Sequence, residues 1–244
     1  MVVAFDAVGP SAAGVASTTS PLTWSHTCGA SANLIVIGVN LSNGLFSAVT
    51  AITYGGQACT LIPGAQVYAG NTGTAGPAQL FALVNPPTGA NTVSVTSTGG
   101  NDVIGGSVSF TGASGTFGTA VKGGSSGGSA AASVTIVTTS GGMIVTLVQS
   151  GSGVTSATAP NVSRYIKNVS TSTAADNSGL STDPSTGGSV TPAWVLVNDT
   201  NAIVGVEILP SGAAAGILPQ QLKKRMPAVF TRLITPNRSG VYSR

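Results

Sequence analysis

Short apolar runs, four to eight residues long, recur along the chain and are separated by glycine, proline, asparagine and serine. This spacing, together with enrichment in β-branched residues, is typical of strands joined by turns. No convincing helical periodicity occurs before residue 217. The expected strands span residues 21–28, 34–39, 48–54, 57–62, 78–84, 91–98, 102–112, 133–139, 142–150, 163–169, 192–198 and 202–210.

Some segments allow a finer prediction. Strict alternation over 21–28 places Trp24, His26 and Cys28 on one face. The uninterrupted run LIVIGV at 34–39 is expected where a strand is covered on both faces. Gly55-Gly56, between two such runs, predicts a hairpin with a tight two-residue turn, and Asn85-Pro86-Pro87-Thr88-Gly89 predicts a strand end and a turn.

Many short strands without intervening helices predict an all-β, antiparallel β-sandwich or jelly-roll-like domain over residues 1–210. Residues 211–244 are then an extended basic C-terminal arm. The Gly/Ser-rich segment 122–131 has the composition of a flexible linker, and one sandwich with a Gly-rich crossover is favoured over two subdomains. Residues 170–189 form a long polar excursion, expected to be a mobile loop or an exposed binding loop.

Charge changes this picture. Only 6% of residues are charged, against about 25% in an average soluble domain. Residues 1–210 carry three basic and six acidic side chains, whereas 211–244 carry six basic and no acidic ones. A nearly uncharged body with a cationic extension is typical of a protein that lives inside an assembly.

Several function classes lose support. No stretch approaches the roughly 20 apolar residues of a membrane helix, and the first residues do not resemble a secretory signal. Cys28 and Cys59 are expected to be buried thiols, with a disulfide as the alternative. Two cysteines and one histidine cannot complete a structural zinc site, so no metal or cofactor is expected.

Side-chain chemistry is sparse. His26 is the only imidazole, and packing or a backbone hydrogen bond is its expected role. Gly123–Gly127 matches G-x-S-x-G but lies in the Gly/Ser segment, where a nucleophile elbow is not expected. The six acids are scattered, which argues against a glycosidase pair. Asp176, Asn177 and Asp183 share the polar excursion and could ligate calcium, although a solvated loop is the simpler interpretation.

Several segments together resemble a known module. The succession FDAVGPS, LTWSHT, LIVIGV, AVTAITYGGQACTLI, LFALVNPPTGANTVSVT, GGSVSFTG and AIVGVEILP, over about residues 1–210, is similar to a β-sandwich module of minor structural proteins in tailed phages, especially those of actinobacterial hosts. The sequence departs from that pattern at Gly55-Gly56, where Asn-Gly is usual, and at Ala113-Ser114-Gly115, where an aspartate often follows. The resemblance implies a non-enzymatic virion protein and supplies no catalytic residues.

The arm is the strongest functional candidate, because apolar side chains interleave with its cations, which is unusual in a disordered tail. Such spacing favours an arm that becomes ordered on a protein partner, with nucleic acid as a less favoured partner and no membrane. The candidate partner-binding residues are Leu222, Lys223, Lys224, Arg225, Met226, Val229, Phe230, Arg232, Leu233, Arg238, Tyr242 and Arg244.

The sequence therefore predicts a virion structural protein, first of all a minor tail protein, held to other virion proteins by residues 217–244 and forming a homo-oligomer within the particle. A capsid decoration protein is the structural alternative. A carbohydrate-binding adhesion module, using Tyr165, Tyr68 and the polar excursion, is the alternative from another class. An enzyme would need a carboxylate pair or His26 in an open cleft.

Overall fold

A computed structural model describes residues 1–42, 45–71, 76–98, 102–169 and 177–212. Within these residues the regular elements are strands, apart from one short 3-10 helix, η1 (Phe46–Ala48). Every strand pair is antiparallel, as in the ladders of β4 with β10 and of β14 with β19. The all-β antiparallel class expected from the sequence is confirmed. Residues Met1–Ala213 form one compact unit, and only this unit is described below.

The first half of the unit contains two sheets. The first central sheet has the order β1 (Ala4–Gly9), β10 (Val103–Thr111), β4 (Leu34–Leu41), β8 (Pro77–Val84) and β7 (Thr60–Tyr68), with β2 (Val15–Ser17) also paired to β10. The first outer sheet has the order β3 (Leu22–Cys28), β9 (Gly89–Ser97), β5 (Val49–Tyr54) and β6 (Gln57–Ala58).

The second half repeats this plan. The second central sheet has the order β11 (Ala113–Phe117), β19 (Ala193–Pro210), β14 (Met143–Ser150), β17 (Asn177–Pro184) and β16 (Val162–Asn168). Strands β12 (Val121–Ser133) and β15 (Val154–Ala157) also pair with the long β19. The second outer sheet pairs β13 (Ile136–Thr138) with β18 (Gly188–Val190).

The two central sheets share one strand order. Their paths match strand for strand: β1 with β11, β10 with β19, β4 with β14, β8 with β17, and β7 with β16. The pairing of β3 with β9 in the first outer sheet likewise has its counterpart in β13 with β18. The compact unit is therefore built from two halves of the same topology.

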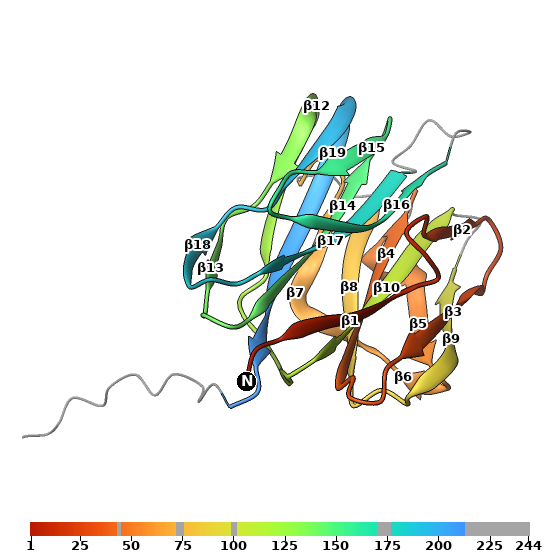
Figure 1. The fold of residues 1–244 in the computed structure, drawn as a ribbon. Helices are drawn as coiled ribbons and strands as arrows, with labels where there is room; N and C mark the ends of the chain where they lie inside the picture. Colours follow the sequence, from red (N-terminus) through yellow and green to blue (C-terminus); the bar gives the residue numbers. More distant parts are fainter. Residues whose placement is uncertain (43–44, 72–75, 99–101, 170–176, 213–244) are drawn as a thin grey trace, which may run out of the picture. The chain divides into compact units, whose positions relative to one another are not determined.

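The sheets form four layers (Figure 1), so the predicted sandwich is extended from two layers to four. One hydrophobic core lies between the two central sheets, and a further core lies between each central sheet and its outer layer. A central strand such as β4 therefore has a core on both faces, and all eight of its residues are buried. This arrangement explains the uninterrupted apolar run at 34–39.

Glycines let the two central sheets approach closely. A Cβ at Gly38 would lie 2.8 Å from Leu147 Cδ1, and a Cβ at Gly106 would collide with the ring of Tyr165. Polar side chains also join the halves: Asn40 Nδ2 donates to the Val148 carbonyl, and Gln149 Nε2 donates to the Leu41 carbonyl, each at 3.3 Å. The interface between the halves is consequently as tightly fitted as a core.

Two predicted loops are strands instead. Residues 122–131 lie within the thirteen-residue strand β12, whose small side chains let it pair with β19, with register shifts between Ser125 and Ala131. Residues 177–184 form β17, which is buried between β14 and β16. The polar side chains of β17 are accommodated by hydrogen bonds, including Ser181 with Thr146 at 2.6 Å and Ser178 with Tyr165 at 3.1 Å. The composition of these two segments wrongly indicated loops, because it carries no information about hydrogen-bond partners that are distant in the sequence.

The turn predictions are confirmed. Tyr54 pairs with Gln57 across Gly55 and Gly56, whose φ angles of 56° and 78° are those a two-residue hairpin turn requires. Strand β8 ends at Val84 and β9 begins at Gly89, on either side of the proline-containing turn.

Candidate functional site

A chain of buried hydrogen bonds surrounds the single histidine. His26 Nε2 lies 3.0 Å from Ser109 Oγ, and Ser109 Oγ donates to Asp6 Oδ2 at 2.6 Å. On the other side, His26 Nδ1 lies 2.9 Å from Ser107 Oγ, which accepts the Trp24 Nε1–H at 3.0 Å. Alternation along the strands brings these groups together: Trp24 and His26 share a face of β3, and Ser107 and Ser109 share a face of β10.

The hydrogen-bond roles in this chain follow from valence. An ionised Asp6 carboxylate can only accept, so Ser109 uses its single proton on Asp6 and accepts the Nε2–H of His26. Nδ1 of a neutral ring must then accept, so the single Ser107 proton has two acceptors within reach, Nδ1 at 2.9 Å and the Gly9 carbonyl at 3.3 Å. Burial lowers the pKa of His26 to about 4, although the nearby Asp6 charge opposes this shift. His26 is thus held neutral.

This network lacks the arrangement of a nucleophilic triad. In a triad the carboxylate orients the histidine and the histidine activates the serine, whereas here Ser109 lies between Asp6 and His26. The histidine is 1% exposed. A Cβ at Gly9 would lie 2.6 Å from His26 Nδ1, so β1 also closes over the ring. The arrangement ties β1, β3 and β10 together and leaves no room for a substrate.

A neutral buried histidine predicts an acid-sensitive fold. Between pH 6.5 and 4 the unfolded state binds a proton at His26 and the folded state does not, so stability falls as pH decreases through this window. The full loss at this site is about 3 kcal/mol. Urea unfolding of wild type and His26→Gln between pH 7 and 4 measures it. The difference in unfolding free energy between the two proteins should shrink as pH falls. The contributions of all other titrating groups cancel in this difference. Parallel pH curves would contradict a neutral buried imidazole.

The carboxylates occupy separate environments. Asp199 accepts from Ser152 Oγ, and Glu207 accepts from the Thr139 amide at 2.7 Å. Within the described part of the chain, no group of three or more His, Cys, Asp or Glu side chains could hold a metal ion. The calcium prediction fails for two of its residues: Asn177 and Asp183 lie near opposite ends of the buried strand β17. Asp176 lies outside the described residues.

The remaining motifs have structural explanations. Gly123–Gly127 lies inside β12, and no helix follows it, so the G-x-S-x-G match is not a nucleophile elbow. Cys28 and Cys59 are free thiols; Cys28 is buried as predicted, whereas Cys59 is partly exposed. Burial raises the pKa of Cys59 to about 12 and also raises that of Cys28, so neither thiol is poised as a nucleophile near neutral pH.

The aromatic residues proposed for sugar binding do not form a platform. Tyr165 is buried between the two central sheets, where its hydroxyl contacts Ser178. The Tyr68 ring is stacked on Phe46, with ring centroids 3.8 Å apart. Trp24 and Trp194 are both buried. The carbohydrate-binding alternative needs Tyr165 to be exposed, but Tyr165 lies in β16, which pairs with the buried strand β17.

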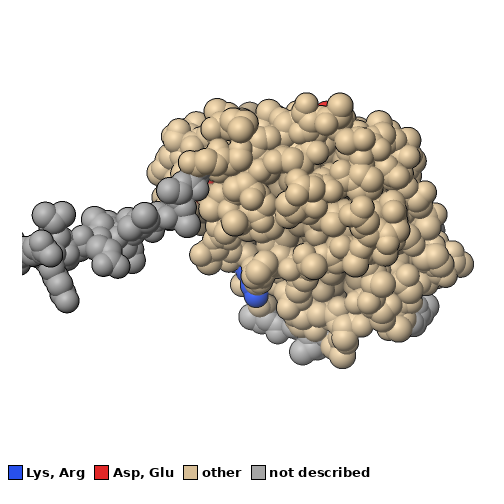
Figure 2. Space-filling view, turned by 90° about the horizontal axis from the view of Figure 1, so that it is seen from below, with Lys and Arg blue, Asp and Glu red and all other residues tan. Residues whose placement is uncertain are grey.

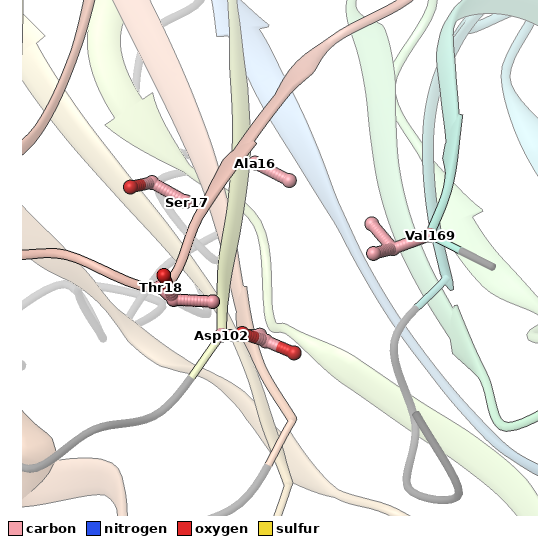
Figure 3. A pocket seen from close by; sticks show the side chains of 5 residues that line it. All are labelled: Ala16, Ser17, Thr18, Asp102 and Val169. Carbon is pink, nitrogen blue, oxygen red and sulfur yellow. The ribbon is translucent and has the colours of Figure 1, made fainter. Parts of the chain in front are cut away.

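A cavity of about 290 Å³ lies between β2 and the end of β16 and is lined by Ala16, Ser17, Thr18, Asp102 and Val169. Figure 3 shows Ala16 and Val169 on opposite sides of this space, with Asp102 at one end. Ser17 Oγ is engaged with Thr19 Oγ1 at 2.9 Å. One carboxylate, without a second titratable group or an aromatic ring, does not define a ligand class.

The most distinctive property of the described surface is its lack of charge. Among the described charged side chains, only Lys122 is exposed; Asp183 and Glu207 are buried, and the others are partly buried. Figure 2 shows a face that is almost entirely free of Lys, Arg, Asp and Glu. The outward positions of the first outer sheet include Thr23, Ser25 and Thr27 on β3 and Thr92 and Thr96 on β9. Such a surface offers little repulsion between neighbouring copies.

All candidate partner-binding residues of the arm, from Leu222 to Arg244, lie outside the described residues. The arm therefore stays a prediction from sequence. No helix in the described part of the chain is long and apolar enough to cross a membrane.

Comparisons with known proteins add no assignment. Neither the family models, nor the curated proteins, nor the solved structures contain a match to this chain. Its function must be argued from its own residues.

Proposed function

We propose that this chain is a structural protein of a bacteriophage particle, with a minor tail protein as the first assignment. The observation that carries the proposal is the distribution of charge. Among the charged side chains of the described body only Lys122 is largely exposed, whereas residues 211–244 contain six cations and no acid. A neutral body can pack against neighbours without electrostatic repulsion, and a cationic arm with apolar side chains can dock into a partner.

Two further points support a structural role. The one imidazole, His26, and the Cys28 thiol are both sealed from solvent. The strand sequences from LTWSHT to AIVGVEILP resemble a module of tailed-phage structural proteins. In this proposal the protein resides in the virion, forms a homo-oligomer there, needs no cofactor, and contacts other virion proteins through its arm. A capsid decoration protein is the alternative with the same chemistry.

Deletion of residues 217–244 tests the role of the arm. We expect the truncated protein to stay folded, with an unchanged urea midpoint, and to be lost from purified particles, because the arm supplies the anchor. Incorporation is measured by immunoblot or mass spectrometry of particles, and separated heads and tails distinguish the tail assignment from decoration. Normal incorporation of the truncated protein would contradict the proposal.

Two matched full-length variants separate the contribution of the arm's cations from that of its apolar side chains. One replaces the six cations with glutamine, and the other replaces Leu222, Met226, Val229, Phe230 and Leu233 with serine. If apolar anchors dominate, the serine variant loses incorporation and the glutamine variant keeps it at low salt. Release of the wild-type protein should become easier as ionic strength rises if the cations contribute.

A further inference from the structure

The chain contains one Asp-Pro pair, Asp183-Pro184, at the end of strand β17. Asp183 is 2% exposed, and its Oδ2 atom has no hydrogen-bond partner among the described residues. Ser185 is also buried, and its Oγ likewise lacks a partner there. Buried polar atoms are usually paired, so two unpartnered groups on either side of Pro184 require an explanation.

The neighbouring strands supply no cation to Asp183. Asp183 is paired with Ile144 on β14, and beyond Ile144 the facing residue on β19 is Glu207, which accepts from the Thr139 amide. On the other side of β17, Arg164 of β16 donates its Nε–H to Thr182 Oγ1. Thr182 directly precedes Asp183 in the strand, so the two side chains lie on opposite faces. Burial raises the pKa of Asp183 above its usual range, so the carboxyl keeps its proton at a pH where an exposed aspartate is ionised.

We infer that the Asp183–Pro184 bond is a self-cleavage site operated by the Asp183 carboxyl group. The proton of the carboxyl is transferred to the proline nitrogen, which is more basic than an ordinary amide nitrogen and therefore leaves more easily. The carboxylate oxygen attacks the carbonyl carbon of its own residue, so the C–N bond breaks as a C–O bond forms. The products of this step are a cyclic five-membered anhydride at Asp183 and a free amino group on Pro184.

Water completes the reaction. One water molecule opens the anhydride and leaves an ordinary aspartate at a new C-terminus, so the sum is hydrolysis of one peptide bond without an oxidant or a cofactor. The unpartnered Ser185 hydroxyl, directly after the end of β17, offers a hydrogen-bond partner for that water. The cleavage therefore requires both a basic proline nitrogen at residue 184 and a protonated carboxyl group on Asp183.

The cut would divide the chain into residues 1–183 and 184–244. The second fragment contains β19, which keeps its ladders to β14 and β12, so the body holds together after the bond breaks. The fragment also contains the cationic residues of the arm. Cleavage would thus end the covalent link between the arm and the first seventeen strands without requiring the body to unfold.

The decisive experiment compares folded and unfolded full-length protein. Samples at pH 5 and pH 2, with and without denaturing urea, are incubated at 37 °C and measured by intact mass spectrometry under denaturing conditions. At pH 5 we expect fragments 1–183 and 184–244 to accumulate several-fold faster in the folded sample, because burial favours the protonated form of Asp183 only in the folded chain. At pH 2 this advantage disappears. Equal or faster cleavage of the unfolded chain at pH 5, or no cleavage at this bond, would overturn the inference.

Variants test the two chemical requirements separately. Pro184→Ala changes an exposed residue and removes the basic leaving nitrogen, and Asp183→Asn removes the carboxyl. Each should lower the rate at pH 5 by at least tenfold, with an unchanged urea midpoint for Pro184→Ala as the check on folding. Asp102→Asn, an aspartate not followed by proline, should cleave like the wild type. A Pro184→Ala protein that is cut at the wild-type rate would exclude the mechanism.

Discussion

Replacing Trp194 with alanine is expected to lower the free energy of unfolding by about 4 kcal/mol, the largest effect of any single side chain considered. Trp194 is fully buried in the core between the second central sheet and its outer layer. Its ring fills the space left at Gly179, where a Cβ would lie 2.6 Å from the ring. Its Nε1–H donates to Thr146 Oγ1 at 3.0 Å. Truncation therefore removes apolar burial, leaves a cavity and breaks a buried hydrogen bond.

Urea unfolding of Trp194→Ala measures this loss, and Val197→Ala on the same strand is the matched control. Val197 is 50% exposed, so its truncation should cost less than about 0.5 kcal/mol. Trp194→Phe should lie between the two, since it keeps most of the packing and loses the hydrogen bond. A Trp194→Ala protein as stable as the control would show that the second half does not depend on this core.

The second large effect is expected at the contact between the two halves. Gly106→Ala should destabilise the protein by about 3 kcal/mol, because the new Cβ would overlap the Tyr165 ring and a close-packed core cannot yield easily. Tyr165 is itself fixed by its hydroxyl contact with Ser178 and by the opposing Gly14, where a Cβ would also meet its ring. Equilibrium unfolding in urea gives the stability of each variant.

Gly127→Ala is the control, since a Cβ at Gly127 meets nothing within 4 Å and its backbone is not in the left-handed region. This control should stay within about 0.5 kcal/mol of the wild type. In the double variant Gly106→Ala/Tyr165→Leu, the smaller side chain gives the new methyl group room, so the combined loss should be less than the sum of the single losses. Strict additivity would show that the two side chains do not meet.

The prediction of individual elements succeeded where the signal was local. Alternation over 21–28 correctly placed Trp24, His26 and Cys28 on one face, which is the buried face of β3, and Gly55-Gly56 correctly gave a hairpin. It failed for β12 and β17, whose Gly, Ser and Thr residues have the composition of loops. These segments become strands because long-range ladders with β19 and β14 satisfy their backbone groups. Composition carries no information about such partners.

The candidate sites show the same division. The sequence identified His26 as the only imidazole, but its partners Asp6, Ser107 and Ser109 are 20 or more residues distant. Asp183 was assigned to a solvated loop, with calcium ligation as the less favoured interpretation, whereas it is a buried carboxyl beside Pro184. A distinguishing signal was available in the Asp-Pro pair itself. Its burial, however, depends on β14 and β16, which no local pattern places beside it.

The sequence by itself determined the all-β class, the tight turns, the nearly uncharged body and the cationic composition of residues 211–244, because each of these is a property of local pattern or of composition. Only the tertiary structure decided that the strands form two halves of one topology in four layers, that Tyr165 and His26 are sealed, and that Asp183 Oδ2 has no partner among the described residues. These features depend on contacts between residues far apart in the chain, where the partner sets the burial and the hydrogen bonds that give a side chain its chemistry.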